Sequence, residues 1–87
     1  MKKFFEYRRG QFVSASEISS VNAQLANYEK SRNEWCVVVR SGNANCPLAV
    51  SKTIGSGEEA AQLATRLVRS LTDDEAKVFS FPEFTEY

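Results

Sequence analysis

The amino-acid sequence predicts an α+β fold: a four- to five-stranded antiparallel sheet with one main helix, residues 57–71, packed on one face. Two observations lead to this fold class. The stretch EWCVVVR, residues 34–40, is rich in β-branched and aromatic residues, which favour strands. The stretch SGEEAAQLATRLVRSL, residues 56–71, carries an apolar stripe at helical spacing behind a capping motif. With 87 residues, the chain is expected to form a single domain, residues 1–87.

The first part of the chain is also predicted to form strands. The stretch KKFFEYRR is aromatic and flanked by charge, which suits a first strand that ends at Gly10. Residues 14–30 allow two interpretations. A helix there would begin with a capping box made by Ser14 and Glu17. We favour a strand over residues 18–28, because serine and asparagine side chains compete for the backbone inside helices; the helix stays the alternative.

A hairpin is predicted between EWCVVVR and the return strand CPLAVSKTI, with Gly42 and Asn43 as a two-residue loop. In this register, facing residues have numbers that sum to 85. One face then carries six apolar residues: Trp35, Val37, Val39, Cys46, Leu48 and Val50. Pro47 lacks an N–H group, so its strand is expected to lie at a sheet edge. A shift of the loop by one residue loses this sorting of side chains.

The only two cysteines of the chain, Cys36 and Cys46, lie in this hairpin. In the predicted register they fall on opposite faces, about 10 Å apart along the strand direction. A disulfide needs Cα atoms within about 7 Å, so we expect none. Cys46 is predicted to be a small buried apolar residue, and Cys36 to lie on the partly open face.

The main helix is expected to begin at the N-cap Ser56, with Glu59 closing a capping box. The apolar face of the hairpin should meet the leucines of this helix: Leu63, Leu67 and Leu71. The stretch TDDEAK, residues 72–77, opens with a second small cap and predicts one further turn. The stretch VFSFPEF, residues 78–84, predicts a short strand broken at Pro82.

Composition and charge bear on the class of function. The net charge is zero, with +3 on residues 1–44 and −3 on residues 45–87, so the chain lacks the broad positive field typical of sequence-independent DNA binding. The chain contains no histidine, and most of its carboxylates in the second half stand at predicted helix starts, where capping explains them. We therefore expect no enzymatic activity, no metal and no cofactor. The absence of a hydrophobic region after MKKFF predicts a cytoplasmic location and no membrane association.

Eight of the ten aromatic residues lie near the two ends of the chain. One interpretation is that the two ends pair and complete the core. The other is that some of these side chains stay exposed and bind a partner, with the aromatic and acidic FPEFTEY docking to a basic protein groove. The predicted partner-binding residues are Phe81, Glu83, Phe84, Tyr87, Arg8 and Arg9.

The order of GQFVSASEISSV, EWCVVVRSG, CPLAV and GSGEEAAQLATRLVRSL resembles small uncharacterised bacterial and phage proteins of the prophage type, which have antiparallel strands followed by one helix. The resemblance covers residues 10–71 and carries no catalytic residue. It implies a phage or mobile-element accessory protein that binds and inhibits a host protein. We therefore expect a non-enzymatic protein-binding module, with a homodimer through an exposed sheet edge as a further expectation. The alternative is a nucleic-acid-binding domain that uses the basic and aromatic N-terminal edge, although net neutrality makes nucleic acid an unlikely partner.

Overall fold

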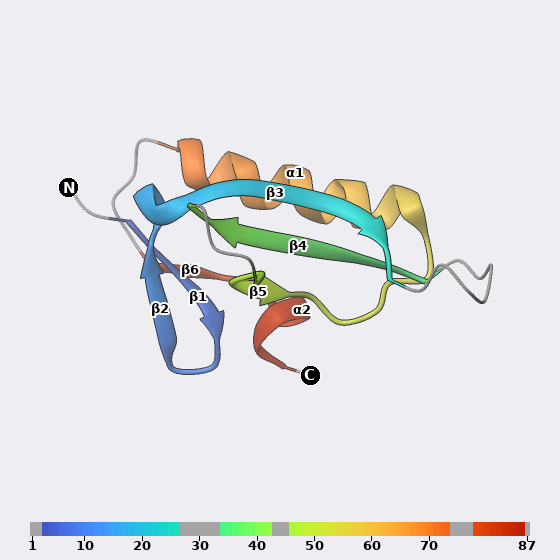
Figure 1. The fold of residues 1–87 in the computed structure, drawn as a ribbon, viewed down its shortest axis with the longest axis horizontal. Helices are drawn as coiled ribbons and strands as arrows, with labels where there is room; N and C mark the ends of the chain where they lie inside the picture. The colour runs from blue at the N-terminus through green and yellow to red at the C-terminus, as the bar shows by residue number, and fades with distance from the viewer. Residues whose placement is uncertain (1–2, 27–33, 43–45, 74–77, 87) are drawn as a thin grey trace.

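The computed structural model describes residues 3–26, 34–42, 46–73 and 78–86 (Figure 1). These residues form six strands, two α-helices and one 3-10 turn. The elements in chain order are β1 (Phe4–Arg8), β2 (Gln11–Ser14), a 3-10 turn (Ala15–Glu17), β3 (Ile18–Leu25), β4 (Trp35–Ser41), β5 (Ala49–Val50), α1 (Gly57–Thr72), β6 (Val78–Ser80) and α2 (Pro82–Thr85).

The strands form two three-stranded sheets, so the predicted single antiparallel sheet of four or five strands is wrong, while the α+β class is confirmed. The first sheet has the order β2-β1-β6 and is mixed, because β1 runs antiparallel to β2 and parallel to β6. The second sheet has the order β3-β4-β5 and is antiparallel throughout. Helix α1 lies against β3 and β4 of this second sheet (Figure 1).

The two ends of the chain meet in the first sheet, as one of the two interpretations of the terminal aromatic residues predicted. Strand β1 pairs with β6, and Phe5 lies opposite Phe79. The two rings stack with centroids 5.3 Å apart, and the ring of Phe84 in α2 meets Phe5 edge-on at 5.4 Å. Such ring pairs add about 0.5–1.5 kcal/mol each beyond the burial of their area.

One hydrophobic core joins both sheets to α1. Val37 and Val39 of β4 are fully buried in the same cluster as Leu63 and Leu67 of α1 and Phe5 of β1. Trp35, Leu48 and Leu71 pack against this cluster and are partly buried. The predicted meeting of the β4 valines with the leucine stripe is therefore confirmed, whereas Val50, which was predicted to join it, is 38% exposed.

The register of the β4–β5 hairpin differs from the prediction. Val39 faces Ala49, so facing numbers sum to 88 instead of 85. A shift by an odd number of residues turns every side chain of the return strand to its other face, which explains why Val50 points outward. Further along the return segment, Ile54 is buried and pairs with Trp35, and Ile54 lies outside the stretch whose sorting suggested the register. Asn43 of the predicted loop is not among the described residues.

The same shift buries a serine instead of an apolar residue. Ser51 is 4% exposed, and its N–H donates to the carbonyl oxygen of Val37 at 2.9 Å. Its hydroxyl oxygen accepts a hydrogen bond from the N–H of Val37 at 2.8 Å and donates to the carbonyl of Lys52. Beyond the end of β5, the Ser51 hydroxyl thus accepts the hydrogen bond from β4 that a strand carbonyl would otherwise accept.

Predictions of single elements from local sequence patterns agree better with the structure. Strand β3 (Ile18–Leu25) confirms the strand interpretation, although Ala26 already lies beyond its end and residues 27–28 of the prediction are not among the described residues. Helix α1 begins after Ser56, whose side chain accepts from the N–H of Glu59. The turn predicted within residues 72–77 falls mainly on residues that the structure does not describe; Thr72 is the last residue of α1. The C-terminal strand stops before Pro82, and the short helix α2 that begins there was not predicted.

Replacement of Leu67 by aspartate should abolish cooperative folding. Leu67 is fully buried, and the loss of such a side chain costs about 2–5 kcal/mol before the buried carboxylate is counted. That cost is comparable to the roughly 5 kcal/mol stability of a marginal domain. Thermal unfolding followed by circular dichroism should show no transition for Leu67→Asp. The control Gln62→Asp, on the exposed side of α1, should keep a transition close to that of the wild type.

Replacement of Ser51 by alanine should destabilise the hairpin without unfolding the protein. The change leaves the buried N–H of Val37 without its acceptor, which costs about 1–3 kcal/mol. Urea unfolding should give a lower midpoint with an unchanged slope. The control Ser80→Ala, at an exposed position of β6, should keep the free energy of unfolding within about 0.5 kcal/mol of the wild-type value. Equal midpoints for the two variants would contradict the role of the Ser51 hydroxyl.

Candidate functional site

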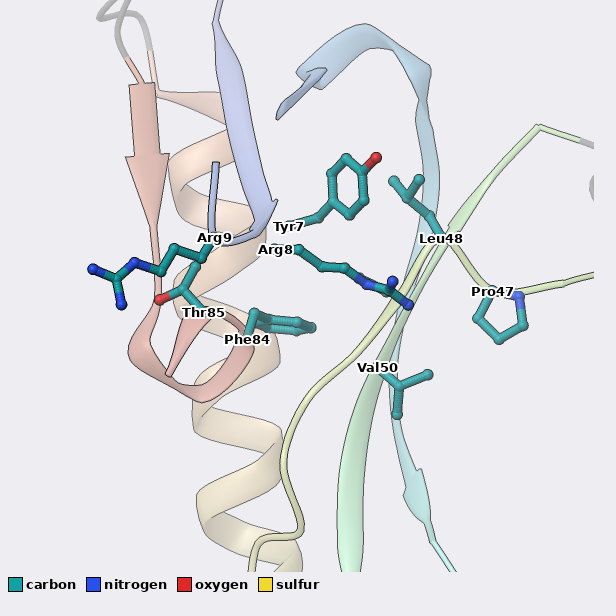
Figure 2. A pocket seen from close by; sticks show the side chains of 9 residues that line it. Tyr7, Arg8, Arg9, Pro47, Leu48, Val50, Phe84 and Thr85 are labelled. Carbon is teal, nitrogen blue, oxygen red and sulfur yellow. The ribbon is translucent and has the colours of Figure 1, made fainter. Parts of the chain in front are cut away.

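A pocket of about 420 Å³ opens where the β1–β2 hairpin, the segment leading into β5, and α2 come together (Figure 2). Its lining residues come from three distant parts of the chain: Tyr7, Arg8 and Arg9; Pro47, Leu48, Ala49 and Val50; and Phe84 and Thr85. The two sheets stand beside each other here without sharing a ladder. We call this pocket the arginine groove.

The sequence of the hairpin explains how its side chains reach the groove. Gly10 has a positive φ of 78°, which a glycine adopts without strain, and its N–H donates to the carboxylate of Glu6 at 2.8 Å. The pairing of β1 with β2 shifts by one residue between Glu6 and Arg8. Strict alternation would send Tyr7 and Arg8 to opposite faces of the sheet, but the bulge lets both line the same pocket.

The two arginines of the groove differ in direction. The side chain of Arg8 extends across the groove towards the β5 side, whereas that of Arg9 points away from it (Figure 2). Both residues are exposed, and neither forms an ion pair with a described residue. Among the described residues, they are the only charged ones that line the groove. The groove therefore has an uncompensated positive charge suited to an anionic group.

Most of the other side chains that line the groove are apolar, apart from the hydroxyl groups of Tyr7 and Thr85. Pro47, Leu48 and Val50 form one wall, and the phenol ring of Tyr7 points towards Leu48 (Figure 2). The ring of Phe84 points in from α2, although only 3% of this residue is exposed because it also packs on Phe5. A ligand in the groove would thus meet a cation on one side and aliphatic or aromatic carbon on the others.

A second cluster fixes α2 in place. Arg66 of α1 forms an ion pair with Glu83 at 3.3 Å, and its guanidinium lies 5.8 Å from the centre of the Phe81 ring. The backbone carbonyl of Glu83 also accepts from the N–H of Lys52 at 2.8 Å. These contacts attach α2 to both α1 and the segment after β5, which holds Phe84 at the floor of the groove.

The structure separates the predicted partner-binding residues into three groups. Arg8, Arg9 and Phe84 come together in the groove. Phe81 and Glu83 face α1, so the acidic group expected to dock on a basic partner is already paired within the chain. Tyr87 is not among the described residues. Sequence reasoning missed Tyr7 and the wall formed by residues 47–50, because nothing local in the sequence shows that these segments meet.

The two cysteines are free, and their environments are the reverse of those predicted. Cys36 is 5% exposed, and burial raises the pKa of its thiol above the ordinary value of 9.0, since the thiolate would lose its hydration. Cys46 is exposed, because the hairpin register shifts and β5 begins only at Ala49. Neither thiol lines the groove.

Other kinds of site find no support in the described part of the chain. Within it, no three Cys, Asp or Glu side chains gather closely enough to hold a metal ion, and the whole sequence lacks histidine. No helix in the described ranges has the length and hydropathy needed to cross a membrane. The cytoplasmic location stays a prediction.

Comparison of the chain with protein-family models, with curated proteins and with solved structures finds no match.

A thiol-reactive probe should distinguish the two cysteines. In the native protein only Cys46 should react rapidly, giving one modified thiol per chain, and Cys36 should react after unfolding in urea. Because the pKa of Cys36 is raised in the folded state, the native protein should lose stability as the pH rises above about 9.0. The variant Cys36→Ser should remove the slow reaction, and rapid modification of both thiols in the native wild type would contradict the burial of Cys36.

Proposed function

We propose that the protein is a non-enzymatic binding module that receives an acidic segment of another protein in the arginine groove. The observation that carries the proposal is the bulge in β1, which turns Arg8 into a pocket lined partly by apolar side chains and leaves its charge without a partner in the described structure. Bulges often redirect side chains at functional sites. A carboxylate beside an aliphatic or aromatic side chain is the chemistry that fits such a groove.

A protein segment suits the groove better than a nucleic acid. A nucleic-acid strand presents a phosphate at every nucleotide, and its binding draws on several cations in a row. The groove offers two arginines, of which one points away from the cavity (Figure 2). The zero net charge of the chain also removes the long-range attraction that brings nucleic acids to basic proteins. We therefore keep nucleic-acid binding as the outcome that would replace the proposal.

The resemblance to prophage-type proteins gives one biological context for this activity. In that context, the acidic segment would belong to a host protein, and its capture would block the host protein from its normal partner. This context stays a prediction and is independent of the groove itself.

Selection from a displayed library of random peptides tests the proposal. Selected peptides should combine aspartate or glutamate with a nearby aromatic or aliphatic residue. Their affinity should fall about tenfold or more for Arg8→Ala, because a charged hydrogen bond contributes roughly 1.5–3 kcal/mol. It should fall less for Arg9→Ala, whose side chain points away, and stay unchanged for the control Arg69→Ala on the exposed side of α1.

Two results would overturn the proposal. One is the failure of any selected peptide to discriminate wild type from Arg8→Ala. The other is a gel shift with single-stranded DNA or RNA at low salt that Arg8→Ala removes, in the absence of peptide binding. Raised salt should weaken peptide binding to the wild type more than to Arg8→Ala.

A further inference from the structure

The longest described strand, β3, lies at the edge of its sheet with half of its backbone groups facing outward. The N–H of Ala26 donates to the carbonyl of Glu34 at 2.6 Å. Because backbone groups of successive strand residues point in opposite directions, this bond shows which residues of β3 direct their N–H groups towards β4. The N–H groups of alternate residues, Ser20, Asn22 and Gln24, therefore point towards β4. Those of Val21, Ala23 and Leu25 point to the open side, where no described residue meets them.

This edge lacks the features that normally prevent pairing with another strand. The segment Ile18–Leu25 contains no charged residue, no proline and no glycine. Its only irregularity is a register shift between Ile18 and Ser20, near its start. Exposed edges are commonly blunted by lysine, by proline or by a bulge. Beyond the register shift, the part from Ser20 to Leu25 contains none of these and is ready to accept a further strand.

Helix α1 presents an uncharged flank on the same side of the molecule. One flank of α1, with Arg66 and Ser70, faces α2 and the start of β1 through its bonds to Glu83 and Lys3. The other flank therefore faces away from them, along β3, and Figure 1 shows α1 and β3 together at the upper margin of the molecule. It carries Ala61, Thr65, Val68 and Thr72, of which Ala61 and Thr65 also border an exposed depression that Glu58, Gln62, Arg66 and Arg69 line.

This flank exposes one large aliphatic side chain, Val68, which is 42% exposed. The hydroxyl of Thr65 donates to the carbonyl of Ala61 at 2.9 Å, and that of Thr72 donates to the carbonyl of Val68 at 3.1 Å. With their hydroxyls bonded along the helix, the threonines have methyl groups left for contact.

We propose that a second copy of this chain pairs with β3 across a two-fold axis at Ala23, so that two three-stranded sheets join into one six-stranded sheet. In this register Ala23 faces its own copy, and Val21 faces Leu25 of the second copy. These residues all have outward backbone groups, so antiparallel pairing forms six new hydrogen bonds. The two α1 helices then lie on the same face of the joined sheet and meet through Val68 and its neighbours.

Three features favour a second copy over a different partner. The strip formed by β3 and by Ala61, Thr65, Val68 and Thr72 of α1 has no charged side chain. It therefore has no charge for an unlike partner to complement and none to repel its own copy. The two-fold register matches small residues at the axis and larger aliphatic residues beside it. The strip is also large enough. It is about 25 Å long and about 20 Å wide across strand and helix, which gives roughly 1,000 Å² over both copies, where specific interfaces begin.

Sedimentation equilibrium tests the dimer directly. Wild-type protein should show twice the 9.8 kDa mass of one chain, with dissociation on dilution. The variant Val68→Lys should be monomeric with an unchanged circular dichroism spectrum, because its position is already exposed. The control Gln62→Lys, on the solvent side of α1, should stay dimeric. A monomeric wild type at all concentrations would overturn the proposal, as would a dimer that Val68→Lys leaves intact.

Amide hydrogen exchange locates the interface independently of the peptide-binding test. In the dimer, the amides of Val21, Ala23 and Leu25 should be protected. In Val68→Lys they should exchange rapidly, while those of Asn22 and Gln24, which bond to β4, stay protected in both proteins. Rapid exchange of all three outward amides in a dimeric wild type would place the interface elsewhere and overturn the pairing through β3.

Discussion

The packing of Phe5 is the contact on which the rest of the structure depends. This ring is fully buried, stacks on Phe79 of the neighbouring strand and meets Phe84 of α2 edge-on. It also belongs to the same core as Val37 of β4 and Leu67 of α1. Residues from both ends of the chain thus surround one side chain of β1. Because the hydrophobic core of so short a chain is small, removal of this ring would separate the first sheet from the second and release α2.

The arginine groove is a consequence of how this core joins two sheets. The sheets share side-chain packing and no ladder, and side chains from both of them line the pocket at their boundary. Strand β5 has two residues and follows Pro47, so the second sheet ends early on that side. The β1 bulge then directs Tyr7 and Arg8 across the boundary. Phe84, held by Phe5 below and by the Arg66–Glu83 pair on α1, closes the floor.

Sequence patterns predicted the elements whose formation depends on neighbours along the chain. The helix 57–71 was predictable from its cap and its leucine stripe, and β4 from its valines. The hairpin register was not, because the sorting of side chains was judged within the hairpin alone and left out Ile54, which is buried and pairs with Trp35. The parallel pairing of β1 with β6 joins residues more than 70 positions apart. The groove is lined by three segments that are distant in the sequence, residues 7–9, 47–50 and 84–85. Arg8, Arg9 and Phe84 were recognised from composition at the chain ends, whereas Tyr7 and Leu48 required the fold.

The positions of the groove and of the β3 edge are related in a way that bears on function. The groove lies beside β5, the strand at the far side of the sheet from β3. A dimer through β3 would therefore leave both grooves open, one at each end of the joined sheet. A single groove with one inward arginine would bind a short acidic segment only modestly, since few groups are desolvated on contact. Two grooves on one rigid sheet would bind a partner with two such segments far more tightly, without any new contact in either groove. The small size of each groove is then compatible with a specific partner, provided that the partner is itself dimeric or carries the acidic segment twice.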